Sequence, residues 1–149
     1  MPLPDALLIF TDGSKTGCGA YLVHGSMPVT LQFLSSPQVI ELHIVIKVFE
    51  LYSASFNLIS DSQYVVNSLA VLEVVGKVNF RSTIGDLLNK WQSLILSSPF
   101  FVQHILVHTG LPGPLAEGND LVDKAARAAS VFLIQTPVEV PVNFIHSFM

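Results

Sequence analysis

The sequence has little of what defines several large protein classes. It contains a single cysteine, Cys18, among 149 residues, and only 12% of its residues are charged. One cysteine cannot close an internal disulfide or supply a cysteine-rich zinc site, so a secreted disulfide scaffold and a zinc ribbon are excluded. The apolar share of 50% also excludes an intrinsically disordered chain. At roughly 100–200 residues per domain, the length predicts one compact domain.

Positive charge is scarce as well. Seven Lys and Arg residues against eleven Asp and Glu residues give a formal net charge of −4. This is the wrong sign for a protein that holds nucleic acid by phosphate neutralisation alone. Any nucleic-acid function must therefore depend on a local site.

Two long segments without charged residues, Thr16–Ile40 and Trp91–Ala116, do not predict membrane spans. Glycines and prolines interrupt both, whereas a span needs about 20 consecutive apolar helical residues. The first residues, Met-Pro-Leu-Pro-Asp, also lack the basic start and apolar core of a secretory signal. We therefore expect a soluble, intracellular protein with no membrane partner.

The pattern of apolar residues predicts a mixed α/β fold. Short runs of strand-forming residues predict five strands, the first three in a meander: Ala6–Thr11, Gly17–His24, Val29–Leu34, Phe56–Ser60 and Phe100–Val107. Helical spacing predicts four helices: Val39–Tyr52, Ser62–Leu69, Ser82–Leu96 and Asn119–Val131. The order β-β-β-α-β-α-α-β-α indicates a mixed sheet flanked by helices.

Polar residues predict the ends and outer faces of these elements. Ser62 and Asn119 are candidate helix N-caps. A turn is expected at Asp12–Ser14 and a loop at His108–Pro114, because both are rich in turn-forming residues. In the first helix a solvent-facing stripe is predicted, formed by His43, Lys47 and Glu50. In the last helix two ion pairs are predicted, Asp120 with Lys124 and Asp123 with Arg127.

Four acidic residues occupy positions that such a fold can bring together. Asp12 and Asp61 each follow a strand, Glu41 lies in the first helix and Asp123 in the last. Neighbouring carboxylates repel one another unless they are protonated or bind cations, and oxygen ligands of this kind suit Mg²⁺ or Mn²⁺. Two such ions about 3.5–4 Å apart can activate a water and stabilise the leaving oxygen of a phosphodiester. The four acids therefore predict metal-dependent phosphodiester hydrolysis.

The same four acids also have ordinary structural interpretations. Asp12 can be a turn residue before Gly13, and Glu41 a partly exposed acid of the first helix. Asp61 can be a cap beside Ser62, and Asp123 an ion-pair partner of Arg127. Most acidic residues of soluble proteins are simply solvated, so spacing alone does not separate the two interpretations.

The local sequences around the acids resemble those of a known family. Five motifs occur in one order: Phe10-Thr11-Asp12-Gly13-Ser14, Ile40-Glu41-Leu42, Ser60-Asp61-Ser62-Gln63-Tyr64-Val65-Val66, His108-Thr109-Gly110-Leu111-Pro112-Gly113-Pro114-Leu115 and Gly118-Asn119-Asp120-Leu121-Val122-Asp123. Together they resemble the ribonuclease H domain of a retroviral reverse transcriptase, most closely the betaretroviral and endogenous retroviral versions. The resemblance covers about Leu7 to Ala129.

This resemblance implies a ribonuclease H-like α/β fold, with a five-stranded mixed sheet flanked by helices. It also implies an endonuclease that hydrolyses the RNA strand of RNA/DNA hybrids by a two-metal mechanism. Two Mg²⁺ ions, replaceable by Mn²⁺, would bind to Asp12, Glu41, Asp61 and Asp123. The implied partners are the hybrid and the polymerase and integrase parts of a Pol polyprotein, in the cytoplasm or within a viral particle.

Further site residues follow from the same resemblance. His108 matches a family histidine that serves proton transfer or product release. Gln63 and Asn119 match residues that contact substrate, and their amides suit the minor groove, where 2′-hydroxyls distinguish RNA from DNA. Ser14 and Ser62, next to the acids, are expected to orient them or to contact a phosphate.

The sequence departs from its relatives at several positions. Leu106-Val107 replaces the Arg-Ala that usually precedes the loop histidine, and Ile40 replaces a smaller or polar residue before the glutamate. Losing a cation weakens phosphate binding. This leaves open a catalytically weak or inactive co-opted endogenous retroviral domain that binds nucleic acid or protein. A separate alternative is a DNA-strand transferase of the same broad fold, although the Asp61–Tyr64 and His108–Pro114 segments favour the hydrolase.

The ends of the chain suggest a part of a longer polyprotein. We expect an N-terminal extension over residues 1–5, a ribonuclease H domain over 6–132, and a C-terminal linker or tail toward a truncated integrase over 133–149. His104 and His108 form an H-x₃-H pair, but no cysteine lies nearby and they sit on a strand that runs into a loop, so zinc binding is not predicted.

Overall fold

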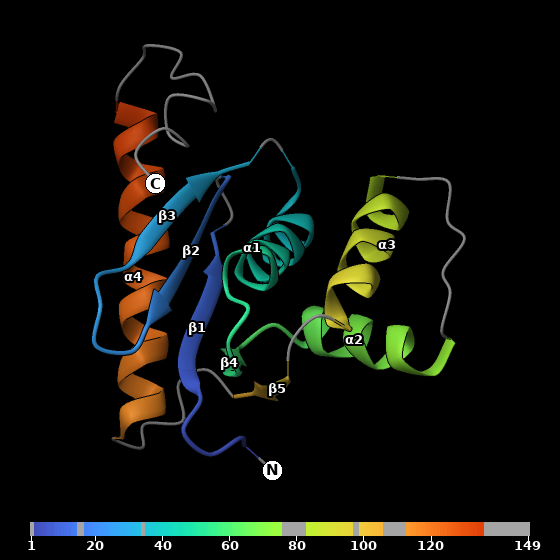
Figure 1. Ribbon diagram of the computed structural model, residues 1–149. Helices are drawn as coiled ribbons and strands as arrows, with labels where there is room; N and C mark the ends of the chain where they lie inside the picture. Colours follow the sequence, from blue (N-terminus) through green and yellow to red (C-terminus); the bar gives the residue numbers. More distant parts are fainter. Residues whose placement is uncertain are drawn as a thin grey trace.

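The computed structural model describes residues 2–14, 17–33, 35–75, 83–96, 99–105 and 113–135. Within them, strands and helices follow one another in the predicted order (Figure 1). The elements are β1 (Leu7–Gly13), β2 (Cys18–Val23), β3 (Val29–Gln32), α1 (Pro37–Leu51), β4 (Phe56–Ser60), α2 (Gln63–Val75), α3 (Thr83–Ile95), β5 (Phe100–His104) and α4 (Pro114–Gln135).

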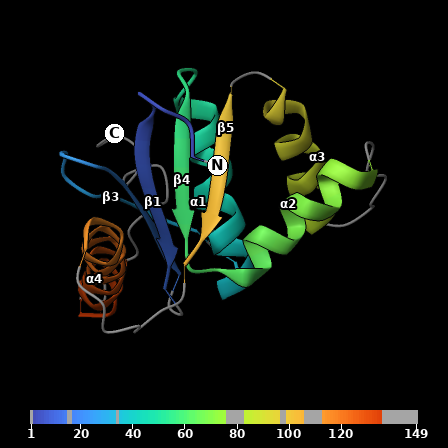
Figure 2. The same ribbon diagram turned by 90° about the horizontal axis from the view of Figure 1, so that it is seen from below.

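The five strands form one mixed sheet in the order β3-β2-β1-β4-β5. The pairs β1–β2 and β2–β3 are antiparallel, which confirms the predicted meander. β4 lies parallel to β1, and β5 lies parallel to β4, so these three strands run in the same direction (Figure 2). The carboxyl ends of β1, β4 and β5 therefore lie at one edge of the sheet.

Helices cover both faces of this sheet (Figures 1 and 2). On one face, Ile9 and Leu58 pack in a core cluster with apolar residues of α1, α2 and α3, including the fully buried Trp91. On the other face, Phe10 and its neighbours pack against Val122 of α4. Because consecutive strand residues point to opposite faces, β1 contributes to both cores. The ribonuclease H-like α/β fold predicted from the motifs is confirmed.

α1 is more deeply buried than its predicted solvent-facing stripe implies. Glu50 is exposed, but His43 and Lys47 are only partly so. The His43 ring stacks on Phe33 at a centroid distance of 4.7 Å. Lys90 of α3 forms a 2.8 Å ion pair with Glu50 of α1. The stripe is therefore an interface with neighbouring elements. α1 is rich in apolar residues, but no helix among the described residues is long and apolar enough to cross a membrane.

Two boundaries near the acidic residues differ from the sequence prediction. The expected turn at Asp12–Ser14 is wrong for its first two residues, because Asp12 and Gly13 pair with Ala20 and Gly19 and continue β1. The expected helix start at Asn119 is also wrong. α4 begins at Pro114, where a missing backbone N–H costs nothing. Asn119 consequently lies inside the helix and does not cap it.

Gly118 lets α4 approach the sheet closely. A Cβ atom at this position would lie 2.2 Å from Cζ of Phe10, a contact that no side chain can make. Gly118 is therefore a packing position within α4. The predicted tail from residue 133 is wrong at its start, because Leu133–Gln135 continue α4, and the predicted loop is wrong at its last residue, Pro114, for the same reason. Residues 108–112 of the loop and 136–149 of the tail lie outside the described residues.

Candidate active site

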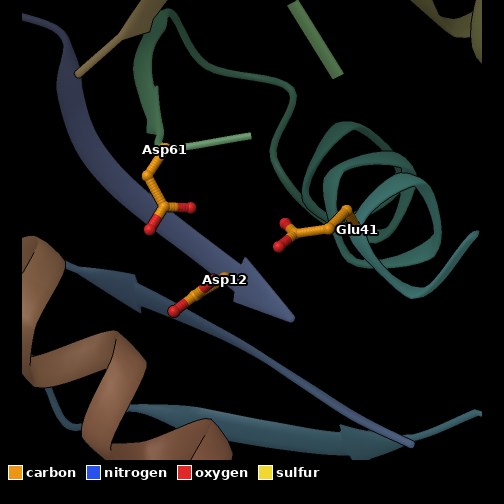
Figure 3. Close-up of side chains that lie close together, drawn as sticks. All are labelled: Asp12, Glu41 and Asp61. Carbon is orange, nitrogen blue, oxygen red and sulfur yellow. The ribbon is translucent and has the colours of Figure 1, made fainter. Parts of the chain in front are cut away.

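Three carboxylates converge at the carboxyl edge of β1 and β4. Asp12 lies near the end of β1, Asp61 directly follows β4, and Glu41 lies near the start of α1. One oxygen of each lies within 4.8 Å of the others, and Figure 3 shows the three side chains close together. The parallel pairing of β1 with β4 produces this meeting, as expected if the two strands are neighbours.

The backbone of Gly13 holds Glu41 in place. Its N–H is shared between Asp12 Oδ1 at 2.9 Å and Glu41 Oε1 at 3.1 Å. A Cβ on Gly13 would lie 3.2 Å from Cδ of Glu41 and 3.1 Å from Cγ2 of Ile40, so a side chain here would press on both neighbours. The bulk of Ile40 is accommodated by two glycines, because it also packs against Gly19.

Asp123 lies at the rim of this three-acid cluster. Its side chain lies close enough to raise the pKa of Asp12, and its charge also raises that of Asp61. Its Oδ2 also accepts a 2.9 Å bond from Arg127, the predicted ion pair. Asp123 is therefore both the structural partner of Arg127 and a neighbour of the cluster, although it is not among the three acids whose oxygens lie within 4.8 Å.

Burial and mutual repulsion make these acids reluctant to ionise. Burial, then the charges of Asp61 and Glu41, raise the pKa of Asp12 to about 9. Burial and the charge of Asp61 raise the pKa of Glu41 to about 7, although the Gly13 N–H acts in the opposite direction. The pKa of Asp61 is also raised, by burial first and by the charge of Asp123 second. At neutral pH such a cluster holds protons unless a cation takes their place.

The cluster fits a divalent cation. Three carboxylates converge, and the second oxygen of Glu41, Oε2, is buried without a hydrogen-bond partner among the described residues. An orphaned carboxylate oxygen in a group of repelling acids is satisfied by a metal ion. Carboxylate oxygens are the ligands that Mg²⁺ and Mn²⁺ prefer.

Comparison with known proteins agrees with this geometry. A model of the family described as RNase H matches residues 4–131. The chain belongs to the ribonuclease H family. This confirms the resemblance inferred from the five motifs.

Curated relatives are retroviral polyproteins. The ribonuclease H chain is 40% identical over 131 residues to the Gag-Pro-Pol polyprotein of squirrel monkey retrovirus, an alignment that covers 85% of the chain and 7% of the relative. It is 36% identical over 141 residues to the Pol-related polyprotein of the mouse intracisternal A-particle MIA14, covering 93% and 16%. It is 39% identical over 132 residues to the Gag-Pro-Pol polyprotein of Mason-Pfizer monkey virus, covering 85% and 7%. The chain spans a small fraction of these relatives.

The substrate residues expected in this ribonuclease H domain lie in different environments. Gln63 is exposed at the start of α2, where its Nε2 donates to Asn67 Oδ1 at 2.8 Å. Asn119 is only 9% exposed and lies one turn from Asp123 on α4, with its Oδ1 unpartnered among the described residues. Ser14 is buried, and its Oγ accepts the Cys18 N–H at 3.2 Å. Gln63 is thus the accessible residue of the three.

The segment that presents Asp61 in the ribonuclease H domain is fixed on both sides. Ser60 Oγ accepts the N–H of Ser62 at 3.0 Å. Ser62 Oγ accepts the N–H of Val65 at 3.2 Å, which confirms the predicted N-cap of α2. The hydroxyl of Ser62 is therefore engaged in the junction between β4 and α2.

Sequence reasoning missed two contributions to the site. One is the Gly13 N–H, which the Asp-Gly pair signals only as a turn. The other is His104, whose Nε2 lies 3.3 Å from the backbone oxygen of Asp61. Its nearness to Asp61 depends on β5 pairing with β4, and strand order cannot be read from the apolar pattern. The expected loop histidine, His108, lies outside the described residues.

Proposed function

We propose that this domain is a metal-dependent endonuclease that hydrolyses the RNA strand of RNA/DNA hybrids, with Asp12, Glu41, Asp61 and Asp123 as the metal ligands. The convergence of buried, repelling carboxylates at one edge of a ribonuclease H sheet carries the proposal. The relatives are Pol polyproteins, whose name fits a reverse-transcribing element and thus a hybrid substrate.

The chain's own residues prepare the site for two Mg²⁺ ions, with Mn²⁺ as a substitute. When bound, such ions activate an attacking water and stabilise the leaving oxygen of the phosphodiester. The Gly13 N–H engages one oxygen of Glu41 and leaves the other free to bind a cation. The protons that burial retains on Asp12 and Glu41 leave when a cation binds, so binding depends on pH.

Five other residues complete the proposal. Gln63, exposed beside Asp61, donates to the minor groove of the hybrid, where the 2′-hydroxyls mark the RNA strand. Asn119, whose buried Oδ1 has no hydrogen-bond partner among the described residues, contacts the substrate. Ser14 and Ser62 orient the acids or contact a phosphate, Ser62 from its position as the cap of α2. His108 transfers a proton or assists product release.

Replacing Asp61 by asparagine tests the proposal. Asp61→Asn removes a charge at constant shape, and we expect cleavage of a labelled hybrid to fall at least about 100-fold, more than most outer-shell changes cause. The assay uses Mg²⁺ and then Mn²⁺, with duplex DNA and duplex RNA as substrates that should not be cut. Asp86→Asn on the exposed surface of α3 is the matched control. Full cleavage by a folded Asp61→Asn variant would reject the assignment.

A second candidate function is a non-enzymatic module that binds hybrid or protein. The observation that favours it is the scarcity of available cations. Three of the four Lys and Arg residues in the described part of the chain are paired with carboxylates: Lys90 with Glu50, Lys124 with Asp120 and Arg127 with Asp123. Mg²⁺ binding without hybrid cleavage at any protein concentration would favour this alternative.

A further inference from the structure

His104 ends β5 next to the residue that follows β4. In the parallel pairing of the two strands, His104 lies opposite Ser60. The N–H of Ile105 donates to the Ser60 oxygen at 3.0 Å and continues this pairing by one bond. The sheet therefore brings the His104 ring to Asp61, 43 positions away along the chain.

The hydrogen bond between His104 and Asp61 can run in only one direction. His104 Nε2 lies 3.3 Å from the backbone oxygen of Asp61, and this partly buried oxygen can only accept. The imidazole must therefore carry a proton on Nε2. Because Nε2 is engaged by the backbone, it is not directed at a substrate or a metal ion.

Three side chains then hold the backbone around Asp61. Ser60 Oγ binds the N–H that follows Asp61, Ser62 Oγ caps α2, and His104 binds the Asp61 oxygen. Two of these bonds are local, whereas the bond from His104 ties the junction to a different strand. Together with the Ile105–Ser60 bond it joins the junction to the end of β5, and it is the bond made to Asp61 itself.

We propose that His104 is a positioning residue: its Nε2–H donates to the backbone oxygen of Asp61 and keeps the Asp61 carboxylate within the cluster formed with Asp12 and Glu41. The consequence for cleavage rests on the proposed function. The consequences for Asp61 geometry and cation binding do not.

Two variants of His104 separate this role from simple packing. His104→Gln keeps a donor at a similar reach, since the Gln amide nitrogen can take the place of Nε2, whereas His104→Leu keeps bulk and removes the donor. Gln103→Leu, one position earlier on β5, is the matched control for placing an apolar residue on this strand.

The first measurement uses the metal-free protein at pH 8. Ring nitrogen shifts in a long-range ¹H–¹⁵N spectrum should show a proton on Nε2 of His104. The Ser62 amide, which belongs to the same peptide group as the Asp61 oxygen, should shift in His104→Leu and stay near its wild-type position in His104→Gln. A ring protonated only on Nδ1, or an unshifted Ser62 amide in His104→Leu, would overturn the proposal.

The second measurement is a calorimetric titration with MgCl₂ alone, followed by hybrid cleavage. We expect His104→Leu to weaken Mg²⁺ binding about 10–100-fold and to lower kcat with KM nearly unchanged, as loss of a supporting hydrogen bond does. His104→Gln should stay within about 3-fold of wild type, which is under 1 kcal/mol. Equal impairment of both variants, or of neither, contradicts the role. If the wild type binds Mg²⁺ but cuts no hybrid, the proposed function fails while the binding data still decide the role of His104.

Discussion

At the scale of single residues, the site is dominated by the burial of Asp12 among other carboxylates. Burial removes water from its charged form, and the neighbouring charges of Asp61 and Glu41 add to the cost. The metal-free domain resolves this conflict by keeping protons on Asp12 and Glu41. The same residues that prepare the site for a cation therefore make the empty site sensitive to pH.

This sensitivity gives a prediction about stability. In the unfolded chain Asp and Glu lose their protons near pH 4, at pKa values of about 3.9 and 4.3. In the folded chain Asp12 keeps its proton up to a pKa of about 9 and Glu41 up to about 7. Between these limits the native state holds more protons, so the free energy of unfolding falls as pH rises from about 4 to about 9. Urea denaturation at pH 5, 7 and 9 in EDTA measures this fall.

Two further experiments test its origin. The variant Asp12→Asn should flatten the profile, because the group with the largest rise in pKa is gone. Saturating Mg²⁺ should raise the free energy of unfolding more at pH 8 than at pH 5, since protons compete with the cation at low pH. A wild-type profile that rises from pH 5 to pH 9 in EDTA would contradict the expectation.

At the scale of elements, the sequence predicts whether a segment is a strand or a helix better than it predicts which other elements that segment packs against. The apolar spacing in Phe56–Ser60 is enough to indicate a strand, but nothing in that segment says that it will lie between β1 and β5. That order follows from α1, which links β3 to β4 and lets β4 pair in parallel with β1. The contribution of His104 to the site was missed for this reason, because it depends on register across β4 and β5.

The acids were predictable because they lie within contiguous motifs. Asp12, Glu41 and Asp61 converge as expected. The start of α4 was not predictable in the same way. Asn119 is a good cap and Gly118 a common boundary residue, so local propensity favours a late start. The helix nevertheless starts earlier, and glycine is the residue type that fits at position 118 against Phe10.

The close approach of α4 to β1 predicts that a Gly→Ala substitution in this helix lowers stability, the opposite of its usual effect. In an ordinary helix Gly→Ala stabilises by about 1 kcal/mol. Gly118→Ala should instead destabilise the domain by about 1–3 kcal/mol, because the new methyl group overlaps the ring of Phe10. Chemical denaturation of Gly118→Ala, Phe10→Leu and the double variant measures the coupling, which should be favourable since Leu makes room for the methyl group. An increase in stability for Gly118→Ala alone would show that α4 does not pack as described.

At the scale of the whole molecule, the fold favours a nuclease site, whereas the net negative charge disfavours binding of nucleic acid. The ribonuclease H sheet assembles an acidic edge, but the chain carries only seven Lys and Arg residues and a net charge of −4. Three of the four cations among the described residues already bind carboxylates. A hybrid carries dense negative charge, so a domain that binds it as proposed does so with little electrostatic attraction from the described cations.

This scarcity predicts a weak and shallow salt dependence. Each neutralised phosphate contributes about 0.7–0.9 to the slope of log affinity against log salt, so we expect a slope smaller in magnitude than about 3. Fluorescence anisotropy with a labelled hybrid, in Ca²⁺ and between 50 and 300 mM KCl, measures it. A covalently attached segment that binds nucleic acid should lower KM and leave kcat within about 3-fold. A slope near −6 for the domain alone would contradict this account.

The place of Asp123 on α4 has one more consequence. Asp12, Glu41 and Asp61 lie in the first half of the 149-residue chain, whereas Asp123 lies on α4, which covers the opposite face of the sheet from α1. The earlier elements by themselves contain only three of the four acids. The fourth proposed ligand is supplied only when α4 packs on its face of the sheet, so the proposed cation binding should depend on that packing.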